Sequence, residues 1–189
     1  MRITGGEAKG RTLKFPPGSV QRPTSDFLRQ ALFNMLQSVE GQLFLDLFAG
    51  SGAVGLEAAS RKAASVVLVE KSKLLAAVIA DNIALCRCPD VCTVIHADVS
   101  SALRNLYEKG IRFDVIFADP PYSRGLIRET FTALMDYPLL KTAGILVFQH
   151  SNREQQPSMP EGWFMFDQRQ YGDNLLTFIR VAEHGNREI

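Results

Sequence analysis

Four consecutive residues, Asp119 to Tyr122, have the groups needed to hold an amino group. Asp119 supplies a carboxylate acceptor, and Tyr122 supplies a ring that can stack on a base. Pro120 and Pro121 have no N–H, so the backbone carbonyls there stay free to accept hydrogen bonds. Such a group would bind an exocyclic nucleobase amine and turn its nitrogen lone pair toward a methyl donor. The alternative, a rigid Pro-Pro turn, explains neither the acid nor the aromatic ring.

A second stretch, residues 43–52, has the sequence Leu-Phe-Leu-Asp-Leu-Phe-Ala-Gly-Ser-Gly. It predicts a buried strand, a tight turn and a helix that begins at Ala53 with free N–H groups facing a ligand. Gly50 and Gly52 allow positive φ and close approach of the backbone. Asp46 disfavours a phosphate and favours a ligand with a cation or hydroxyls, such as an aminoacyl-sulfonium nucleoside. Taken alone, this stretch is explained equally well by a purely structural turn.

Two more acids follow expected strands. Glu70 ends the run 65–70, eighteen positions after Gly52, where nucleotide-binding folds have an acid that binds ribose hydroxyls. A surface glutamate at a strand end is the alternative. Asp98 follows the run 91–96, and it would either reach an adenine amino group or cap a helix that begins near Ser100. The sequence leaves these two roles of Asp98 open.

The elements that must position these residues alternate along the chain. We expect strands at 43–47, 65–70, 91–96, 113–118 and 145–150, separated by helices at about 53–62, 72–85, 100–109 and 124–136. This alternation predicts a parallel, doubly wound sheet whose crossovers bring the acids and glycines to one edge. Segments 163–169 and 174–181 around a Tyr-Gly-Asp-Asn turn predict a terminal antiparallel hairpin. The fold class is therefore α/β, a Rossmann-like doubly wound sheet of seven strands.

The N-terminal part is expected to form a small extension of this domain. We divide the chain into a basic hairpin and linker (1–23), a catalytic domain (24–182) and a tail (183–189). A helix capped by Thr24 or Ser25 should run to about Glu40, with Leu28, Ala31, Leu32, Met35 and Leu36 facing the core. Residues 1–30 contain six basic and two acidic side chains, although the net charge of the chain is only +1. This asymmetry fits a polyanionic partner and an ordinary solvated surface equally well.

Composition excludes several classes of protein. The 189 residues are 46% hydrophobic and 22% charged, and no apolar run reaches the length of a membrane span. The N-terminus has no secretory signal, so we expect a cytoplasmic protein without membrane contact. Cys86, Cys88 and Cys92 are too closely spaced for a disulfide framework and lack a fourth ligand nearby. We therefore expect reduced thiols and no metal.

At this point the sequence resembles a known family. Residues 46–52 resemble motif I of class I S-adenosylmethionine-dependent methyltransferases, and residues 119–122 resemble their motif for amino-group methylation. More narrowly, Gly5-Gly6, Gly10-Arg11-Thr12-Leu13, residues 22–26 and residues 31–34 resemble the RsmD family of bacterial 16S ribosomal RNA guanine-N2 methyltransferases. The resemblance extends through Tyr171-Gly172-Asp173, which is nearly the whole chain.

The resemblance implies an enzyme that uses S-adenosylmethionine, releases S-adenosylhomocysteine and acts on 16S ribosomal RNA of the small subunit. We expect a monomer, although the sequence does not give the oligomeric state. The guanine amine would donate to Asp119 and to the Pro120 carbonyl, and its nitrogen would attack the methyl group in line. The implied catalytic residues are Asp119, Pro120, Pro121 and Tyr122. The implied cofactor residues are Thr24, Asp46, Phe48, Ala49, Gly50, Gly52, Glu70, Lys71, Asp98 and Val99. Basic residues expected to contact RNA are Lys9, Arg11, Arg22, Arg29 and Arg124.

Three residues depart from the family pattern. Phe27 and Gln30 lie where a basic and an acidic residue are expected, and Gln149 lies where relatives often have Glu. These departures concern a local ion pair or an RNA contact, not methyl transfer.

Other functions remain open at the level of sequence. Adenine-N6 and protein-glutamine methyltransferases use a similar tetrapeptide, often with Asn in place of Asp119. A non-catalytic RNA-binding assembly factor is a different class, but it would not need the intact acids and glycines. A nicotinamide oxidoreductase has no use for Asp-Pro-Pro-Tyr.

Overall fold

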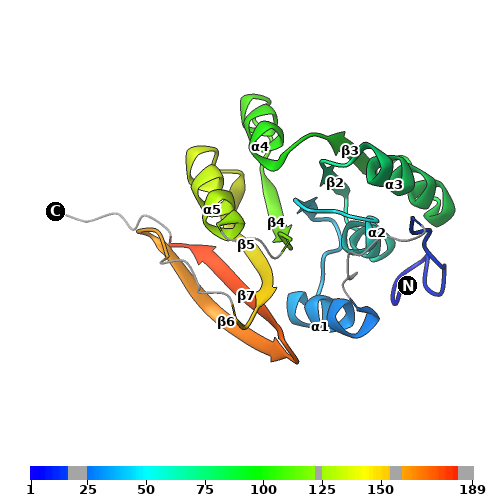
Figure 1. Cartoon of the computed structure of the whole chain (residues 1–189), viewed down its shortest axis with the longest axis horizontal. Helices are drawn as coiled ribbons and strands as arrows, with labels where there is room; N and C mark the ends of the chain where they lie inside the picture. Colours follow the sequence, from blue (N-terminus) through cyan, green and yellow to red (C-terminus); the bar gives the residue numbers. More distant parts are fainter. Residues whose placement is uncertain (17–24, 122–124, 154–158, 183–189) are drawn as a thin grey trace.

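Strands that are buried on both faces form the centre of the molecule. The computed structural model describes residues 1–16, 25–121, 125–153 and 159–182. Within them, seven strands form one sheet in the order β3-β2-β1-β4-β5-β7-β6 (Figure 1). The strands are β1 (Leu43–Asp46), β2 (Ser65–Glu70), β3 (Cys92–His96), β4 (Phe113–Ala118), β5 (Leu140–Ser151), β6 (Trp163–Tyr171) and β7 (Asn174–Val181). The predicted fold class is confirmed.

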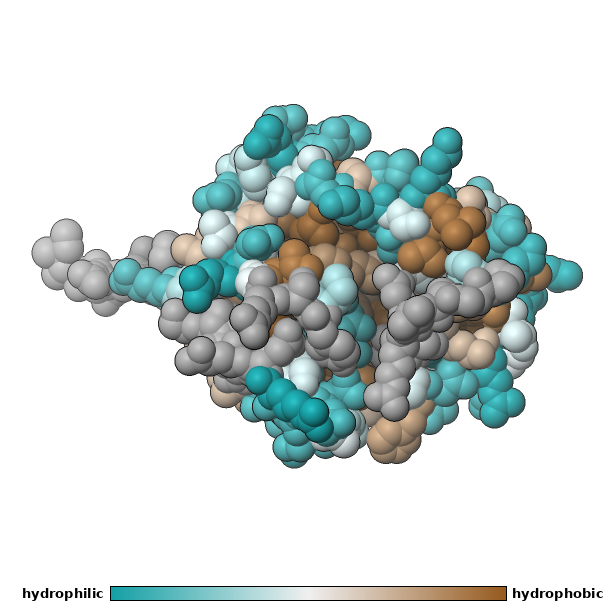
Figure 2. Space-filling view, in the orientation of Figure 1, coloured by the Kyte–Doolittle hydropathy of each residue, from teal (hydrophilic) through white to brown (hydrophobic). Residues whose placement is uncertain are grey.

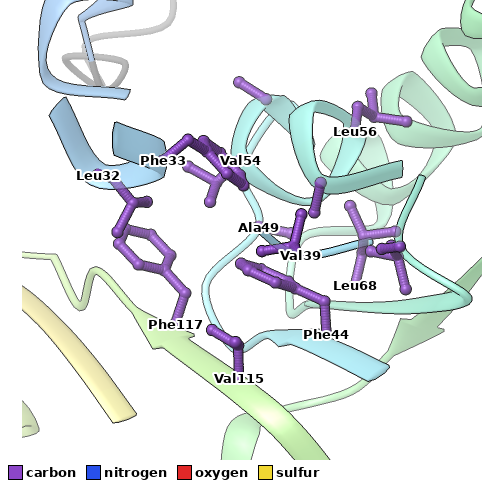
Figure 3. Close-up of a cluster of buried hydrophobic side chains, with 14 of the residues drawn as sticks. Leu32, Phe33, Val39, Phe44, Ala49, Val54, Leu56, Leu68, Val115 and Phe117 are labelled. Carbon is purple, nitrogen blue, oxygen red and sulfur yellow. The ribbon is translucent and has the colours of Figure 1, made fainter. Parts of the chain in front are cut away.

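Helices cover both faces of this sheet. They are α1 (Asp26–Leu36), α2 (Ala53–Ser60), α3 (Lys73–Cys86), α4 (Val99–Glu108) and α5 (Leu126–Asp136). Apolar residues of α1, α2 and α3 join one core cluster, and those of α4 and α5 join the other. Successive strand residues point to opposite faces, so Phe44 belongs to the first cluster and Leu45 to the second. Figure 3 shows Leu32 of α1 lying against Phe117 of β4 in the first cluster.

The strand order reverses at β1, and this reversal positions the site. β1 pairs in parallel with β2 on one side and with β4 on the other, so Asp46 is in register with Leu68 and with Phe117. The chain connections leave in opposite directions from this point, which opens a crevice beyond the carboxyl ends of the strands. The expected residues at the ends of β1, β2 and β4 therefore meet at one edge of the sheet.

The terminal hairpin has the predicted arrangement. β7 pairs antiparallel with both β5 and β6, and the two-residue turn between β6 and β7 contains Gly172 at a φ of 60°. β5, in contrast, begins five residues earlier than expected. Leu140 pairs with Phe113, and the next paired residues are Ile145 and Val115, so an irregular bulge precedes the predicted strand.

The first helix is shorter and rotated relative to the prediction. Ser25 caps it by accepting a hydrogen bond from the Leu28 amide, as expected, but it ends at Leu36 because Gln37 has a φ of 62°. The buried residues of α1 are Leu28, Arg29, Leu32, Phe33 and Leu36. Arg29 and Phe33 are thus buried where the prediction had Ala31, which is only half-buried, whereas Met35 packs against the core cluster as expected.

The N-terminal segment packs into the main core. The predicted hairpin is reduced to one antiparallel bridge between Arg2 and Thr12. Ile3, Ala8 and Leu13 are buried in the same cluster as α1, α2 and α3. Gly6 lies so close to α2 that a Cβ atom there would overlap the Ser60 carbonyl, so a larger residue would push the segment off the helix. No helix of the described ranges is long and apolar enough to span a membrane.

Candidate active site

A cavity of about 1340 Å³ lies at the carboxyl ends of β1, β2 and β4. Its volume exceeds the range of about 300–1000 Å³ typical of a single small-ligand site, so it has room for more than one small ligand. Figure 2 shows apolar side chains gathered near the centre of one face of the molecule, with hydrophilic residues around them. Most of the predicted site residues that the structure describes line the cavity: Asp46, Phe48, Ala49, Gly50, Glu70, Lys71, Asp98, Val99, Asp119, Pro120 and Pro121.

The glycine-rich turn forms one wall. The Ala49 amide donates to the Val69 carbonyl (3.0 Å), and the Gly52 amide closes the turn on the Ala49 carbonyl (2.7 Å). Gly50 has a φ of 57° and no atom within 4 Å of the position that a Cβ would take, so its backbone faces open space. Gly52 caps α2 and does not line the cavity; a Cβ there would lie 3.2 Å from side-chain atoms of Leu56 and Leu68. Gly50 leaves room for a ligand, whereas Gly52 satisfies a left-handed backbone and tight packing.

Asp46 is a buried carboxyl at the base of this wall. Its Oδ2 accepts a hydrogen bond from the Gly55 amide (3.1 Å), and its Oδ1 has no hydrogen-bond partner among the described residues. Burial raises the pKa of Asp46 to about 7, and the nearby Glu70 adds to this effect. An unpaired acceptor with a raised pKa is suited to a ligand that brings a cation or a hydroxyl donor.

Glu70 is held in place by two backbone amides, one from the glycine-rich turn and one from the loop that follows β2. One carboxylate oxygen accepts from the Gly50 amide (2.8 Å), and the other accepts from the Ser72 amide (2.7 Å). Each oxygen keeps a second lone pair, so the carboxylate can still accept from hydroxyls at the cavity. The structure therefore fixes Glu70 to the glycine-rich turn.

Asp98 has the capping role that the sequence left open. Its carboxylate accepts from the amide (2.9 Å) and the hydroxyl (2.8 Å) of Ser101 at the start of α4. The hydrogen bond from the Ser101 amide is the main cause that lowers the pKa of Asp98. Asp98 also lines the cavity, so capping and ligand contact are compatible at this position.

The end of β4, the strand next to β1, forms a further part of the lining. Asp119 is half-buried, Pro120 is buried and Pro121 is exposed, and all three line the cavity. Tyr122, together with the predicted Thr24, Arg22 and Arg124, lies outside the described residues. One cavity thus contains Asp46 and Glu70 together with Asp119 and Pro120.

The sequence did not identify Gln149 as a site residue. Ala118 is in register with Phe148, so Asp119 and Gln149 follow side by side on neighbouring parallel strands. Gln149 is only 4% exposed, lines the cavity and leaves its Oε1 without a hydrogen-bond partner in the described part of the chain. The sequence did contain one indication of this role: Gln149 is a polar residue at the end of an otherwise apolar run that was predicted to be a buried strand.

The predicted RNA-contacting residues differ in exposure. Lys9 is exposed, and Arg11 is half-buried and donates to the Leu85 carbonyl. The prediction for Arg29 is wrong, because its side chain is fully buried. It donates to Glu57 (3.1 Å) and Asp26 (3.0 Å), so it holds α1 against α2 and cannot reach RNA.

Phe27 and Gln30 both lie on the exposed side of α1. Because both are uncharged, they do not form the ion pair that the family pattern suggests at these positions. Phe27 is 66% exposed, and its ring meets that of Tyr171 edge to face at 5.8 Å. The three cysteines are free thiols; Cys88 Sγ and Cys92 Sγ lie 3.6 Å apart.

Comparisons with known proteins agree with this geometry. A family model described as "Conserved hypothetical protein 95" matches residues 1–180. Ribosomal RNA small subunit methyltransferase D of Escherichia coli K12 is 35% identical, over 100% of this chain and 93% of that protein. The structure of yhhF from Escherichia coli, a candidate methyltransferase, is 30% identical with a TM-score of 0.85, covering 97% of this chain and 98% of that one. A more distant methyltransferase, SMU.776, complexed with S-adenosylhomocysteine, shares the fold at 15% identity (TM-score 0.67; 80% and 48% covered).

Proposed function

The chain belongs to the RsmD family, and we propose that it transfers a methyl group from S-adenosylmethionine to the N2 amino group of a guanine in 16S ribosomal RNA. The family and the fold support a methyltransferase acting on small-subunit ribosomal RNA. The guanine N2 target is our proposal, and it rests on the chemistry of the cavity.

The residues on the glycine-rich side fit S-adenosylmethionine. The cofactor supplies a methyl group on a positively charged sulfur, together with an ammonium group and a ribose diol. Asp46 Oδ1 is a buried acceptor without a partner, which such donors would satisfy. Glu70 can accept from the ribose hydroxyls while the Gly50 amide holds it in place. Gly50, Asp98 and Val99 line the same space, where a larger residue at position 50 would obstruct the cofactor.

The residues after β4 fit an amino group on a base. The Asp119 carboxylate and the Pro120 carbonyl would accept its two hydrogens, so the nitrogen lone pair points away from both acceptors. As the new N–C bond forms and the C–S bond breaks, the nitrogen becomes acidic, and its proton leaves to Asp119 or to solvent. Fixed acceptors near this developing charge would supply most of the acceleration.

One observation carries the proposal: Asp46 and Glu70 share a single cavity with Asp119 and Pro120. A cofactor site alone would fit many methyltransferases, and an acid followed by two prolines alone would fit a turn. Both in one cavity, large enough for a nucleoside and a base, support transfer between two ligands bound side by side.

The test is methyl incorporation from labelled S-adenosylmethionine into small ribosomal subunits that lack this modification, followed by nucleoside analysis. We expect N2-methylguanosine. N6-methyladenosine would overturn the guanine target but keep amino methylation. Transfer to protein, or cofactor binding without any transfer, would overturn the RNA substrate and favour the glutamine-methylating or non-catalytic alternatives.

A further inference from the structure

Gln149 combines features that rarely occur together in a folded protein. Its side chain is 4% exposed, yet its Oε1 has no hydrogen-bond partner in the described part of the chain. Buried polar atoms are nearly always paired, because an unpaired acceptor loses its bonds to water without replacement. Gln149 also lines the cavity, so the missing donor is one that a ligand can bring.

The position of Gln149 assigns it to the substrate side of the cavity. It follows Phe148, which is in register with Ala118, just as Asp119 follows Ala118 on the neighbouring strand. Phe117 and Val147 belong to the core cluster on the sheet face that α1 covers, and strand alternation sends Gln149 to the same face. Asp119 follows the last residue of β4. Leu28 of α1 and Phe117 line the cavity on the same side. A flat base held at Asp119 would therefore lie next to the carboxamide.

The two candidate bases differ in the atom beside the reactive amine. In guanine, the N2 amine is adjacent to N1–H, a hydrogen-bond donor. In adenine, the N6 amine is adjacent to N1, an acceptor. We propose that Gln149 Oε1 accepts the N1–H of guanine and thereby selects guanine over adenine, a role that rests on the proposed methylation of guanine N2. The amide nitrogen of the same side chain can donate to guanine O6, so the carboxamide matches two neighbouring atoms of the base edge.

The first test replaces Gln149 with Met, which has a similar length and no hydrogen-bonding groups. Gln42 provides a matched control, because its Oε1 is also buried without a partner but it does not line the cavity. We expect kcat/KM for methylation of unmodified small subunits to fall at least 30-fold in Gln149→Met and less than twofold in Gln42→Met. Gln149→Glu retains an acceptor. The logarithm of its kcat/KM should lie at least a third of the way from the value of Gln149→Met to that of the wild type.

Stability and cofactor affinity separate this role from a structural one. Gln149→Met removes an unpaired buried acceptor, so its Tm should equal or exceed that of the wild type. Its affinity for S-adenosylhomocysteine should stay within twofold. Activity within threefold of the wild type would overturn the inference. A lowered Tm or a weakened cofactor affinity that accounts for the lost activity would also overturn it.

An atomic substitution in the RNA tests the hydrogen bond itself. Once the methylated guanosine is mapped, it can be replaced by 2-aminopurine, which keeps the amine at position 2 but lacks N1–H and O6. The wild type should methylate this RNA at least 30-fold less efficiently, whereas Gln149→Met should discriminate less than threefold. Equal discrimination by both proteins would overturn the role of Gln149 while leaving guanine methylation intact. If the wild type forms no N2-methylguanosine at all, the proposed function fails instead.

Discussion

At the scale of single residues, two of the carboxyl groups that line the cavity, those of Asp46 and Asp119, have contrasting environments. Asp46 is buried with an unpaired oxygen, and Asp119 is half-buried at a strand end beside two prolines. The environment of Asp46 suits a cationic ligand. The environment of Asp119 suits the amino group of an RNA base, which must reach the site from outside. The two acids should therefore respond differently to substitution.

Asp119→Ala should reduce methyl transfer by at least about 100-fold, the loss typical when one fixed group that stabilises charge in the transition state is removed. Affinity for S-adenosylhomocysteine should be unchanged, because we assign cofactor binding to Asp46 and Glu70 and not to Asp119. Radiolabelled methyl transfer and calorimetric titration measure the two quantities. Transfer at more than a tenth of the wild-type rate would show that Asp119 is not an acceptor for the amine.

Cofactor affinity should rise with pH because of Asp46. Its pKa of about 7 means that the carboxyl is mostly protonated at pH 6 and mostly ionised at pH 8. A cationic ligand binds the ionised form better, so binding releases a proton below pH 7. Affinity should therefore increase about tenfold between pH 6 and pH 8 and then level off.

Calorimetry of S-adenosylmethionine binding in buffers of different ionisation enthalpy measures both the affinity and the proton release. Asp46→Asn serves as the control, and its affinity should be weaker but nearly independent of pH. A wild-type affinity that does not change between pH 6 and pH 8 would contradict the raised pKa of Asp46.

At the scale of elements, a buried ion cluster holds the N-terminal segment, α1 and α2 together. Glu57 of α2 accepts from Arg29 of α1 (3.1 Å), from Arg61 (2.9 Å) and from both the amide and the hydroxyl of Thr4 (2.8 Å each). Arg29 and Glu57 are both fully buried. The cluster supports Leu28 and Ser25, which line the substrate side of the cavity.

Glu57→Gln should lower the free energy of unfolding by about 3–5 kcal/mol, because it removes the buried counter-ion of Arg29 and leaves that guanidinium with only the partly exposed carboxylate of Asp26. Urea unfolding measures this change. Lys62→Met removes only an exposed pair with Glu40 and should cost less than about 1 kcal/mol. A similar cost for both variants would mean that the buried pair contributes no more than a surface pair.

At the scale of the whole molecule, the basic N-terminal segment remains our proposal for RNA contact. Lys9 is exposed there, and Arg11 is half-buried. Met1 and Phe15 line the cavity, so this segment borders the site as well as the core. A polyanion bound along it would lead toward Asp119.

Replacing both Lys9 and Arg22 with Ala should weaken RNA binding and reduce the slope of log affinity against log salt by about 2, because each basic side chain neutralises about one phosphate. Filter binding of 16S ribosomal RNA across a salt series measures the slope. Lys109→Ala is the control, because this exposed lysine follows α4, which belongs to the core cluster on the other face of the sheet from the N-terminal segment. An unchanged slope in the double variant would remove these residues from the RNA interface.

Several features were determined by the sequence itself. The apolar runs at 65–70 and 113–118 became β2 and β4 with the predicted bounds, because strands buried on both faces need continuous apolar residues. The glycine-rich turn and the Tyr-Gly-Asp-Asn turn also formed where predicted, since left-handed backbone strongly favours glycine. Local chemistry and chain connectivity were enough to bring Asp46, Glu70 and Asp119 to one edge.

Other features were decided only by tertiary structure. Arg29 was predicted to be exposed, but α1 is rotated so that Arg29 meets the buried Glu57, a residue 28 positions away. Gln149 was noted only as a departure from a family pattern, although the register of β4 and β5 sets it beside Asp119. Whether a polar side chain is paired or left without a partner depends on what the rest of the chain packs against it. Burial and pairing between distant segments are therefore properties of the folded molecule and not of the local sequence.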